Sequence, residues 1–385
     1  MNGGPPTIVP SPPVVLEVRD AVESLELVKR GEELDRAPRF PQETFRALGD
    51  RHLLGLRTAR AEGGRGLPLR DVAAALHELA RASGTTFAKL CLQPEFCEVL
   101  AARGGAELRA RYFRPLTEGR CLVANHVTEP SAGSDASALE CVARRDGDEY
   151  VLDGTKSEAA FATDADAAIV YARTGANGVS AFLVPQDLDG IERTVNAPDL
   201  GERWMRRGQV RYSGTRIPAS HRLGEEGSGF HGLKAELTRE RLLLAAIYLG
   251  VGRASFEETV TYVGERSAFG SPLSAHQAVG FPLAEDWGRL DAGWLYVDRA
   301  LGRLEAGHDV TAEAALAKWM ATDTALRAID HAIQFHGGRG YSGRLPHERR
   351  FRDVRSGRIA HGPDEVMLRT AAGALWSRPA GRRNG

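Results

Sequence analysis

The chain has 385 residues, 42% of them hydrophobic and 26% charged, and its 50 Lys and Arg nearly balance its 51 Asp and Glu, leaving a formal charge of -1. This composition is typical of a globular protein with two or three domains, and the balanced charge excludes a global field that would attract nucleic acid or an anionic membrane. The four cysteines lack metal-ligand spacing and are too few for a disulfide framework, so we expect a reducing, cytoplasmic location and no metal site. We also expect no membrane span, because no window approaches eighteen uninterrupted apolar residues.

Residues 15–120 form the first of three regions that differ in the spacing of their apolar residues. Apolar residues there recur at three- and four-residue spacings, as at Leu69, Val72, Leu76 and Leu79, which predicts a helical domain. Residues 121–225 alternate short apolar segments with tight turns and predict a small β-domain.

Residues 226–377 return to long Ala- and Leu-rich segments. They predict helices over 241–265, 276–306 and 311–336, with turns at Gly270, Gly307 and Gly337-Gly338. Residues 1–14 and 378–385 are expected to be disordered tails. Helices, then strands, then helices indicate an α+β fold.

Three short segments stand out against this background. Residues 126–135 read His-Val-Thr-Glu-Pro-Ser-Ala-Gly-Ser-Asp, residues 266–270 read Arg-Ser-Ala-Phe-Gly, and residues 334–341 read Gln-Phe-His-Gly-Gly-Arg-Gly-Tyr. Each has an ordinary reading: a turn after a strand, a helix end with its Gly stop, and a Gly-rich connection between helices. The second and third segments also suit a phosphate-bearing cofactor, because a guanidinium bonds two phosphate oxygens at once and paired glycines let backbone amides approach closely.

Taken in order, these segments resemble the signatures of acyl-CoA dehydrogenases, and the resemblance runs from about residue 40 to residue 375. It implies a central β-barrel-like domain, a C-terminal four-helix bundle and an FAD bound between them. The cofactor-binding positions implied by the resemblance are Val127, Thr128, Ser134, Glu158, Ala160, Arg266, Phe269, Gln277, Gln334, Gly337 and Gly338.

The resemblance also implies partners. Substrate contacts fall at Ser134, Arg241, His361 and Gly362. The substrate would be an acyl thioester of coenzyme A or of an acyl carrier protein, and the electrons would pass to an electron-transfer acceptor or to oxygen. The Gly337-Gly338 segment touches a neighbouring subunit's cofactor in the family, so a homotetramer or homodimer is expected.

Family members remove a proton from the acyl Cα while flavin N5 accepts a hydride from Cβ, so they need a base beside Cα. The usual base is a Glu late in the chain, but His361 occupies that position here. Some branches of the family place the Glu near the start of the first bundle helix, where this chain has Glu240 followed by Arg241. We therefore expect Glu240 to be the base. An alternative is that Glu240 merely favours the first turn of a helix capped by Thr238.

His361 has two interpretations of its own. A neutral imidazole could itself accept a proton near neutral pH. The favoured interpretation is a spacer or a polar contact to an unusual acyl group, because the family relies on a carboxylate at this place.

A second departure follows Lys156. The resemblance places a flavin-shielding aromatic residue at position 158 and a Thr that approaches N5 at position 160, but the chain has Glu158 and Ala160. Phe161 could replace the aromatic residue if the register slips. With Ala160 in place of the Thr, flavin N5 loses a hydrogen-bond partner, and this loss predicts a non-standard substrate.

Three functions therefore remain open. The first is an FAD-dependent acyl-thioester dehydrogenase with Glu240 as base. The second is a flavin-dependent monooxygenase on the same fold, and the third is a non-catalytic relative that binds DNA. The charge balance and the short basic end at residues 378–383 argue against the third.

Overall fold

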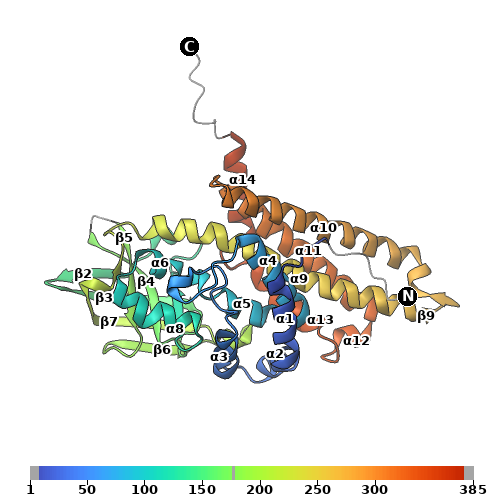
Figure 1. The fold of residues 1–385 in the computed structure, drawn as a ribbon, viewed down its shortest axis with the longest axis horizontal. Helices are drawn as coiled ribbons and strands as arrows, with labels where there is room; N and C mark the ends of the chain where they lie inside the picture. The colour runs from blue at the N-terminus through green and yellow to red at the C-terminus, as the bar shows by residue number, and fades with distance from the viewer. Residues whose placement is uncertain (1–7, 176–177, 377–385) are drawn as a thin grey trace, which may run out of the picture.

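The computed structural model describes residues 8–175 and 178–376 and has three parts (Figure 1). A β-domain lies at one end of the long axis, a helical bundle at the other, and the N-terminal helices cover the middle (Figure 1). This is the predicted α+β plan. The N-terminal helices are α1 Pro13–Ser24, α2 Leu27–Arg36, α3 Gln42–Asp50, α4 Leu69–Ser83, α5 Thr85–Leu92, α6 Glu98–Arg103, α7 Ala106–Leu108 and α8 Arg114–Thr117.

The β-domain is a mixed, mostly antiparallel sheet. Its strands are β1 Val123–His126, β2 Val142–Asp146, β3 Glu149–Ala159, β4 Ala167–Arg173, β5 Val179–Pro185, β6 Ile191–Val195, β7 Gly208–Pro218 and β8 Arg222–Leu223. They follow the order β6-β7-β3-β2-β4-β5-β8, and β1 pairs in parallel with β4. Strand β5 is buried along its whole length, whereas β7 largely alternates buried and exposed residues, so the β5 side of the sheet is covered and its β7 side is half solvated.

The C-terminal part is built on four long helices and two short ones. They are α9 Gly229–Glu265, α10 Gln277–Glu305, α11 Thr311–His336, α12 Gly338–Tyr341, α13 His347–Arg355 and α14 Asp364–Trp376, and a small hairpin of β9 Ser267–Ala268 and β10 Ser271–Pro272 joins α9 to α10. Helices α9, α10, α11 and α14 pack together as the expected bundle, and α4 packs on α9 from the N-terminal part. The predicted turn residues Gly270, Gly307 and Gly337 all have positive φ.

Two expectations about helix and tail boundaries need correction. Helix α9 begins at Gly229, so Thr238 is not an N-cap and Glu240 does not lie in a first turn. The Thr238 hydroxyl instead donates to the carbonyl of Lys234 within the helix, at 3.0 Å. The tails that were expected to be disordered fall mostly outside the described residues, but Pro13 and Val14 already belong to α1.

A buried ion pair fixes the segment after β1 against β3. Lys156 is fully buried and donates to Glu129 Oε1 at 2.7 Å and to the Val127 carbonyl at 3.1 Å. Glu129 also accepts the backbone N–H of Cys141, at 3.1 Å. The Ser157 N–H donates to the Thr128 carbonyl at 2.9 Å, so the residues after Lys156 run beside the Thr128 segment.

Lys156→Met should lower the free energy of unfolding by about 3–5 kcal/mol, because it leaves the Glu129 carboxylate buried without its cation. The exposed Arg144–Asp153 pair of the same sheet supplies the control. Arg144→Met should cost less than about 1 kcal/mol. Urea denaturation measures both, and equal losses would show that the Lys156 pair is not a buried anchor.

Candidate active site

Glu240 lies on the buried face of α9, in the middle part of the molecule. Its carboxylate is buried, and its Oε1 has no hydrogen-bond partner among the described residues. Burial raises the pKa of Glu240 to about 8; Arg239 and Arg241 lower it, and the Glu95 carboxylate raises it. A carboxyl group with that pKa can both take and release a proton near neutral pH.

His361 faces Glu240 from the turn before α14. Its Nε2 lies 3.7 Å from Glu240 Oε2, which is too long for a hydrogen bond. The backbone of this turn is held by two cations: Arg241 Nε donates to the His361 carbonyl at 3.0 Å, and Lys318 Nζ donates to the Gly362 carbonyl at 2.5 Å. The imidazole stacks on Phe96, with ring centroids 5.1 Å apart. The ring is therefore clamped beside Glu240 without being bonded to it.

The tight turn requires Gly362. Its φ is 100°, and a Cβ at this position would come within 2.4 Å of Met367 Cε. His361 itself adopts φ 55°, in the left-handed region. The strained backbone and the two hydrogen bonds from Arg241 and Lys318 hold the imidazole toward α9.

The pKa values separate the two candidate bases. Burial lowers the pKa of His361 to about 3, and the positive charges of Lys89, Lys318 and Arg241 act in the same direction. The imidazole is therefore neutral and weakly basic at physiological pH. Glu240, with its raised pKa, is the stronger base of the pair.

Arg241, His361 and Gly362, expected to contact substrate, lie together with Glu240. Sequence reasoning missed several polar groups around them. Glu95 accepts a hydrogen bond from Arg239 at 3.1 Å. Glu236 lies one helical turn before Glu240 and is also buried. The four-residue spacing of two Glu in a helix otherwise rich in buried Leu and Ala was the available signal.

The expected flavin positions form a second group in the β-domain. Val127 and Thr128 lie beside Ser157, and His126 Nε2 lies 3.3 Å from the Ala160 carbonyl. Glu158 has φ 52°, and its side chain accepts a hydrogen bond from Asn196 at 3.2 Å. The structure thus brings residues 126–128 and 157–160 together.

Phe161 does not take the place of the missing aromatic residue. It is 2% exposed and packs against Phe40 and Trp204, with ring centroids 5.5 Å apart in each pair. A ring enclosed in this way has no open face for a cofactor, so the register-slip alternative is wrong.

The remaining expected cofactor positions lie at the other end of the molecule. Arg266 directly follows α9, which at 37 residues is about 55 Å long. Phe269 is 98% exposed beside the hairpin β9–β10, at the end of the long axis opposite the β-domain (Figure 1). A Cβ on Gly337 or Gly338 would meet nothing within 4 Å, so their backbone is open to a ligand or a partner chain. Gln277 begins α10, and Gln334 lies in the last turn of α11.

Comparison with known proteins now decides the family. Residues 15–120, 124–214 and 227–375 match the N-terminal, middle and C-terminal domains of acyl-CoA dehydrogenases. The chain belongs to the acyl-CoA dehydrogenase family. Its members are flavin oxidoreductases, as the resemblance predicted.

Individual relatives match over nearly the full length. The benzylmalonyl-CoA dehydrogenase of Aromatoleum aromaticum is 35% identical over 340 residues, 87% of this chain and 89% of that protein. A probable acyl-CoA dehydrogenase from Mycobacterium abscessus superposes with a TM-score of 0.91 at 29% identity, over 94% of this chain and 97% of that one. A glutaryl-CoA dehydrogenase from Mycobacterium smegmatis, solved in complex with FADH2, superposes with a TM-score of 0.89 at 25% identity, over 96% and 95%.

Within residues 8–175 and 178–376, no helix combines the length and hydropathy needed to cross a bilayer. The same residues contain no group of three or more His, Cys, Asp or Glu placed to hold a metal ion.

Glu240→Gln should stabilise the protein increasingly as the pH rises from 4.5 toward 8. In the wild type the carboxyl group has a higher pKa in the folded state than in the unfolded state, so ionisation above pH 4.5 favours the unfolded state. The wild type therefore loses stability as the pH rises toward 8, whereas the variant has no ionisable group at this position and does not. Urea denaturation of the variant and the wild type at pH 5 and pH 8 measures the difference. Glu257→Gln, on the same helix but in a surface pair with Arg81, is the control and should show no such growth. A pH-independent difference for Glu240→Gln would contradict the buried, protonated carboxyl.

Proposed function

We propose that the chain is an FAD-dependent dehydrogenase of acyl thioesters carried by coenzyme A or an acyl carrier protein, with Glu240 as the base. One observation carries the proposal. The Glu240 carboxyl group is buried, has a pKa near 8 and keeps one oxygen without a partner among the described residues. An acid–base residue works best when its pKa lies close to the working pH.

The residues around Glu240 perform the proton chemistry. Glu240 takes the Cα proton on a carboxylate oxygen, and the guanidinium groups of Arg239 and Arg241 favour its ionised form beforehand. His361 stays neutral and does not compete for the proton. Its stacking on Phe96 and its clamped backbone hold one wall of the site in place. Bound FAD supplies the acceptor for the Cβ hydride.

The two groups of expected cofactor residues fit an FAD held by two chains. In this proposal, Val127, Thr128 and Ser134 hold the flavin end from the β-domain. The phosphate end is held by residues at the far end of a second chain's bundle: Arg266, Phe269, Gln277, Gln334, Gly337 and Gly338. The separation along α9 and the open glycine backbone support this division. A homodimer or homotetramer follows.

Glu158 and Ala160 favour a non-standard acyl group as the substrate. Ala160 offers no hydroxyl to the flavin, and Glu158 adds a carboxylate beside the place of the shielding ring. The name of the Aromatoleum relative, a benzylmalonyl-CoA dehydrogenase, supports substrates other than plain fatty acyl groups within this part of the family.

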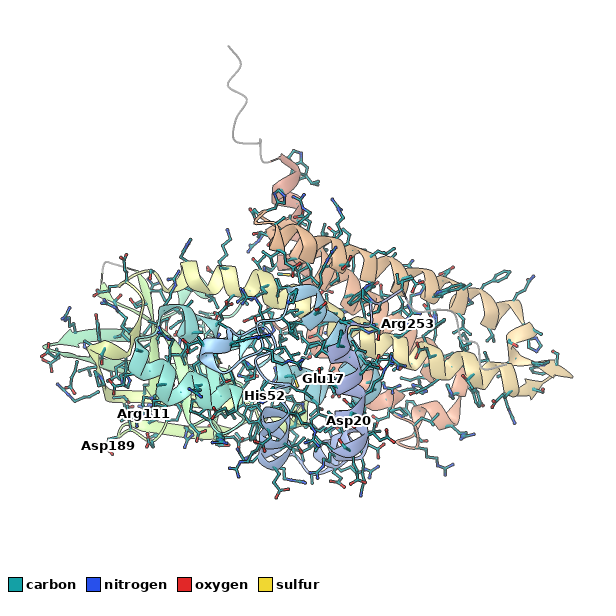
Figure 2. The ribbon with its side chains drawn as sticks, viewed as in Figure 1. Glu17, Asp20, His52, Arg111, Asp189 and Arg253 are labelled. Atoms are coloured by element: carbon teal, nitrogen blue, oxygen red, sulfur yellow. The ribbon has the colours of Figure 1, made fainter. Side chains whose placement is uncertain are left out.

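Ala160 also favours a second candidate, a flavin-dependent monooxygenase on the same fold. FAD that co-purifies tightly with the protein would count against it, because monooxygenation with diffusible reduced flavin does not need a retained cofactor. A DNA-binding relative is disfavoured, since charged side chains of both signs, such as Arg111 and Asp189, lie on the β-domain side (Figure 2).

Glu240→Gln should reduce anaerobic flavin bleaching by an acyl thioester at least about 1,000-fold, because the α-proton loses its base while the shape of the site is kept. His361→Asn is the matched control and should cost less than about tenfold. Stopped-flow absorbance measures both. Normal bleaching by Glu240→Gln would exclude Glu240 as the base.

Arg266→Glu should release FAD, since a carboxylate repels the cofactor phosphates. The exposed Arg211→Glu on β7 should retain it. Thr128→Asp should also weaken FAD binding, at the flavin end. Mixed oligomers of the Arg266→Glu and Thr128→Asp chains should recover FAD in a fraction of their sites, because one site per pair then combines two intact ends. Flavin absorbance of the purified mixture measures this, and no recovery would contradict a site shared between chains.

A further inference from the structure

Glu236 is a second buried carboxyl group on the face of α9 that carries Glu240. The two residues are four positions apart, so their side chains are neighbours on the helix surface, separated by about 6 Å along its axis. Glu236 is 3% exposed. Its Oε1 accepts the backbone N–H of Val99 at 2.6 Å, whereas its Oε2 finds no partner in the described part of the chain.

Tyr171, on β4, adds a second polar atom without a partner. Its side chain is fully buried, and its hydroxyl makes no hydrogen bond to any described residue. Burial raises the pKa of Tyr171 well above its usual value, and the charges of Glu236 and Glu240 raise it further. The hydroxyl therefore lies within the field of both carboxyl groups. Burial and the Glu236 charge also raise the pKa of Cys97, but the Cys97 thiol already has a partner, because its Sγ donates to the Val123 carbonyl at 3.3 Å.

Unpaired polar atoms at this depth are costly, and buried polar groups in folded proteins are nearly always bonded. Burial and the Glu240 charge raise the pKa of Glu236, Glu95 acts in the same direction, and the Val99 N–H and Arg103 oppose them. Neither protonation state supplies a partner for Oε2 from the described chain. Glu236 and Glu240 lie four positions apart on α9, so the two carboxyl groups are neighbours on one side of the helix.

We propose that Glu236 and Tyr171 form a subsite for a hydrogen-bond-donating substituent of the acyl group, an amino or hydroxyl group about one helical turn from the reacting carbon. The inference rests on the proposed function and deepens it by naming the substrate class. Two carboxyl groups and a phenol accept such a donor. An acyl chain ending in a carboxylate is rejected, because it would bring a negative charge into a buried space that already disfavours the ionised forms of Glu236 and Glu240.

The test is equilibrium binding to the FAD-loaded protein, measured by calorimetry with S-alkyl thioethers of coenzyme A. These probes cannot be dehydrogenated and do not cyclise. Their chains have equal length and end in a methyl, hydroxyl, amino or carboxylate group. In the wild type, the hydroxyl and amino probes should bind about tenfold more tightly than the methyl probe, and the carboxylate probe more weakly.

Three variants locate the effect. Glu236→Gln keeps the acceptor for the Val99 N–H and should abolish most of the preference for the amino probe. Tyr171→Phe should reduce the preference for the hydroxyl probe several-fold. Glu257→Gln, on the same helix about 30 Å from Glu236, should leave the preferences unchanged.

Two outcomes overturn the subsite. One is equal binding of all probes by the wild type. The other is a Glu236→Gln variant that weakens the methyl and hydroxyl probes alike, since the donor would then belong to the pantetheine arm common to all probes. Binding requires no turnover, so selective binding together with undiminished bleaching by Glu240→Gln would defeat the proposed base and leave the subsite standing.

Discussion

One long helix sets the geometry on which the rest of the structure depends. Helix α9 starts at Gly229, where a Cβ would lie 2.9 Å from the Val179 carbonyl of β5, and it ends at Glu265 beside the hairpin β9–β10. It is covered by α4, α10 and α11, and its buried residues are nearly continuous from Leu242 to Phe256. A helix enclosed on so many sides cannot shift without opening the core. The position of Glu240 relative to both ends of α9 is therefore fixed.

The buried charges of this protein fall into two kinds. Some are paired within the chain: Lys156 bonds Glu129, and Lys89 bonds Glu202, whose own N–H donates to Asp353 at 2.7 Å. Such pairs join segments distant in sequence and fix their relative positions. Glu240 and Glu236 differ, because each keeps an oxygen that no described residue satisfies. Desolvation without a full set of partners raises the pKa of both groups, as expected for the roles proposed for them.

The turn that carries His361 faces Glu240 and is held in place without the help of the imidazole. The turn that carries the imidazole is held by Arg241 and Lys318 through backbone carbonyls, so the side chain contributes shape and polarity and is not needed to anchor the loop. Burial and three nearby cations keep the ring neutral. With Glu240 on α9 as the proposed base, the late turn is free to carry a neutral polar residue.

Much of this could be read from the sequence because the signals are local. Helix α11 spans Thr311–His336 as predicted, since its apolar spacing and the glycines at its ends are local properties. The ordered motifs indicated the family, and the position before Arg241 indicated Glu240. Tertiary structure decided the start of α9, the enclosure of Phe161 by Phe40 and Trp204, the lack of a described partner for Glu236 Oε2, and the separation of Arg266 from Thr128. Each of these depends on burial, which results from contacts between segments far apart in the chain, so no local sequence pattern predicts it.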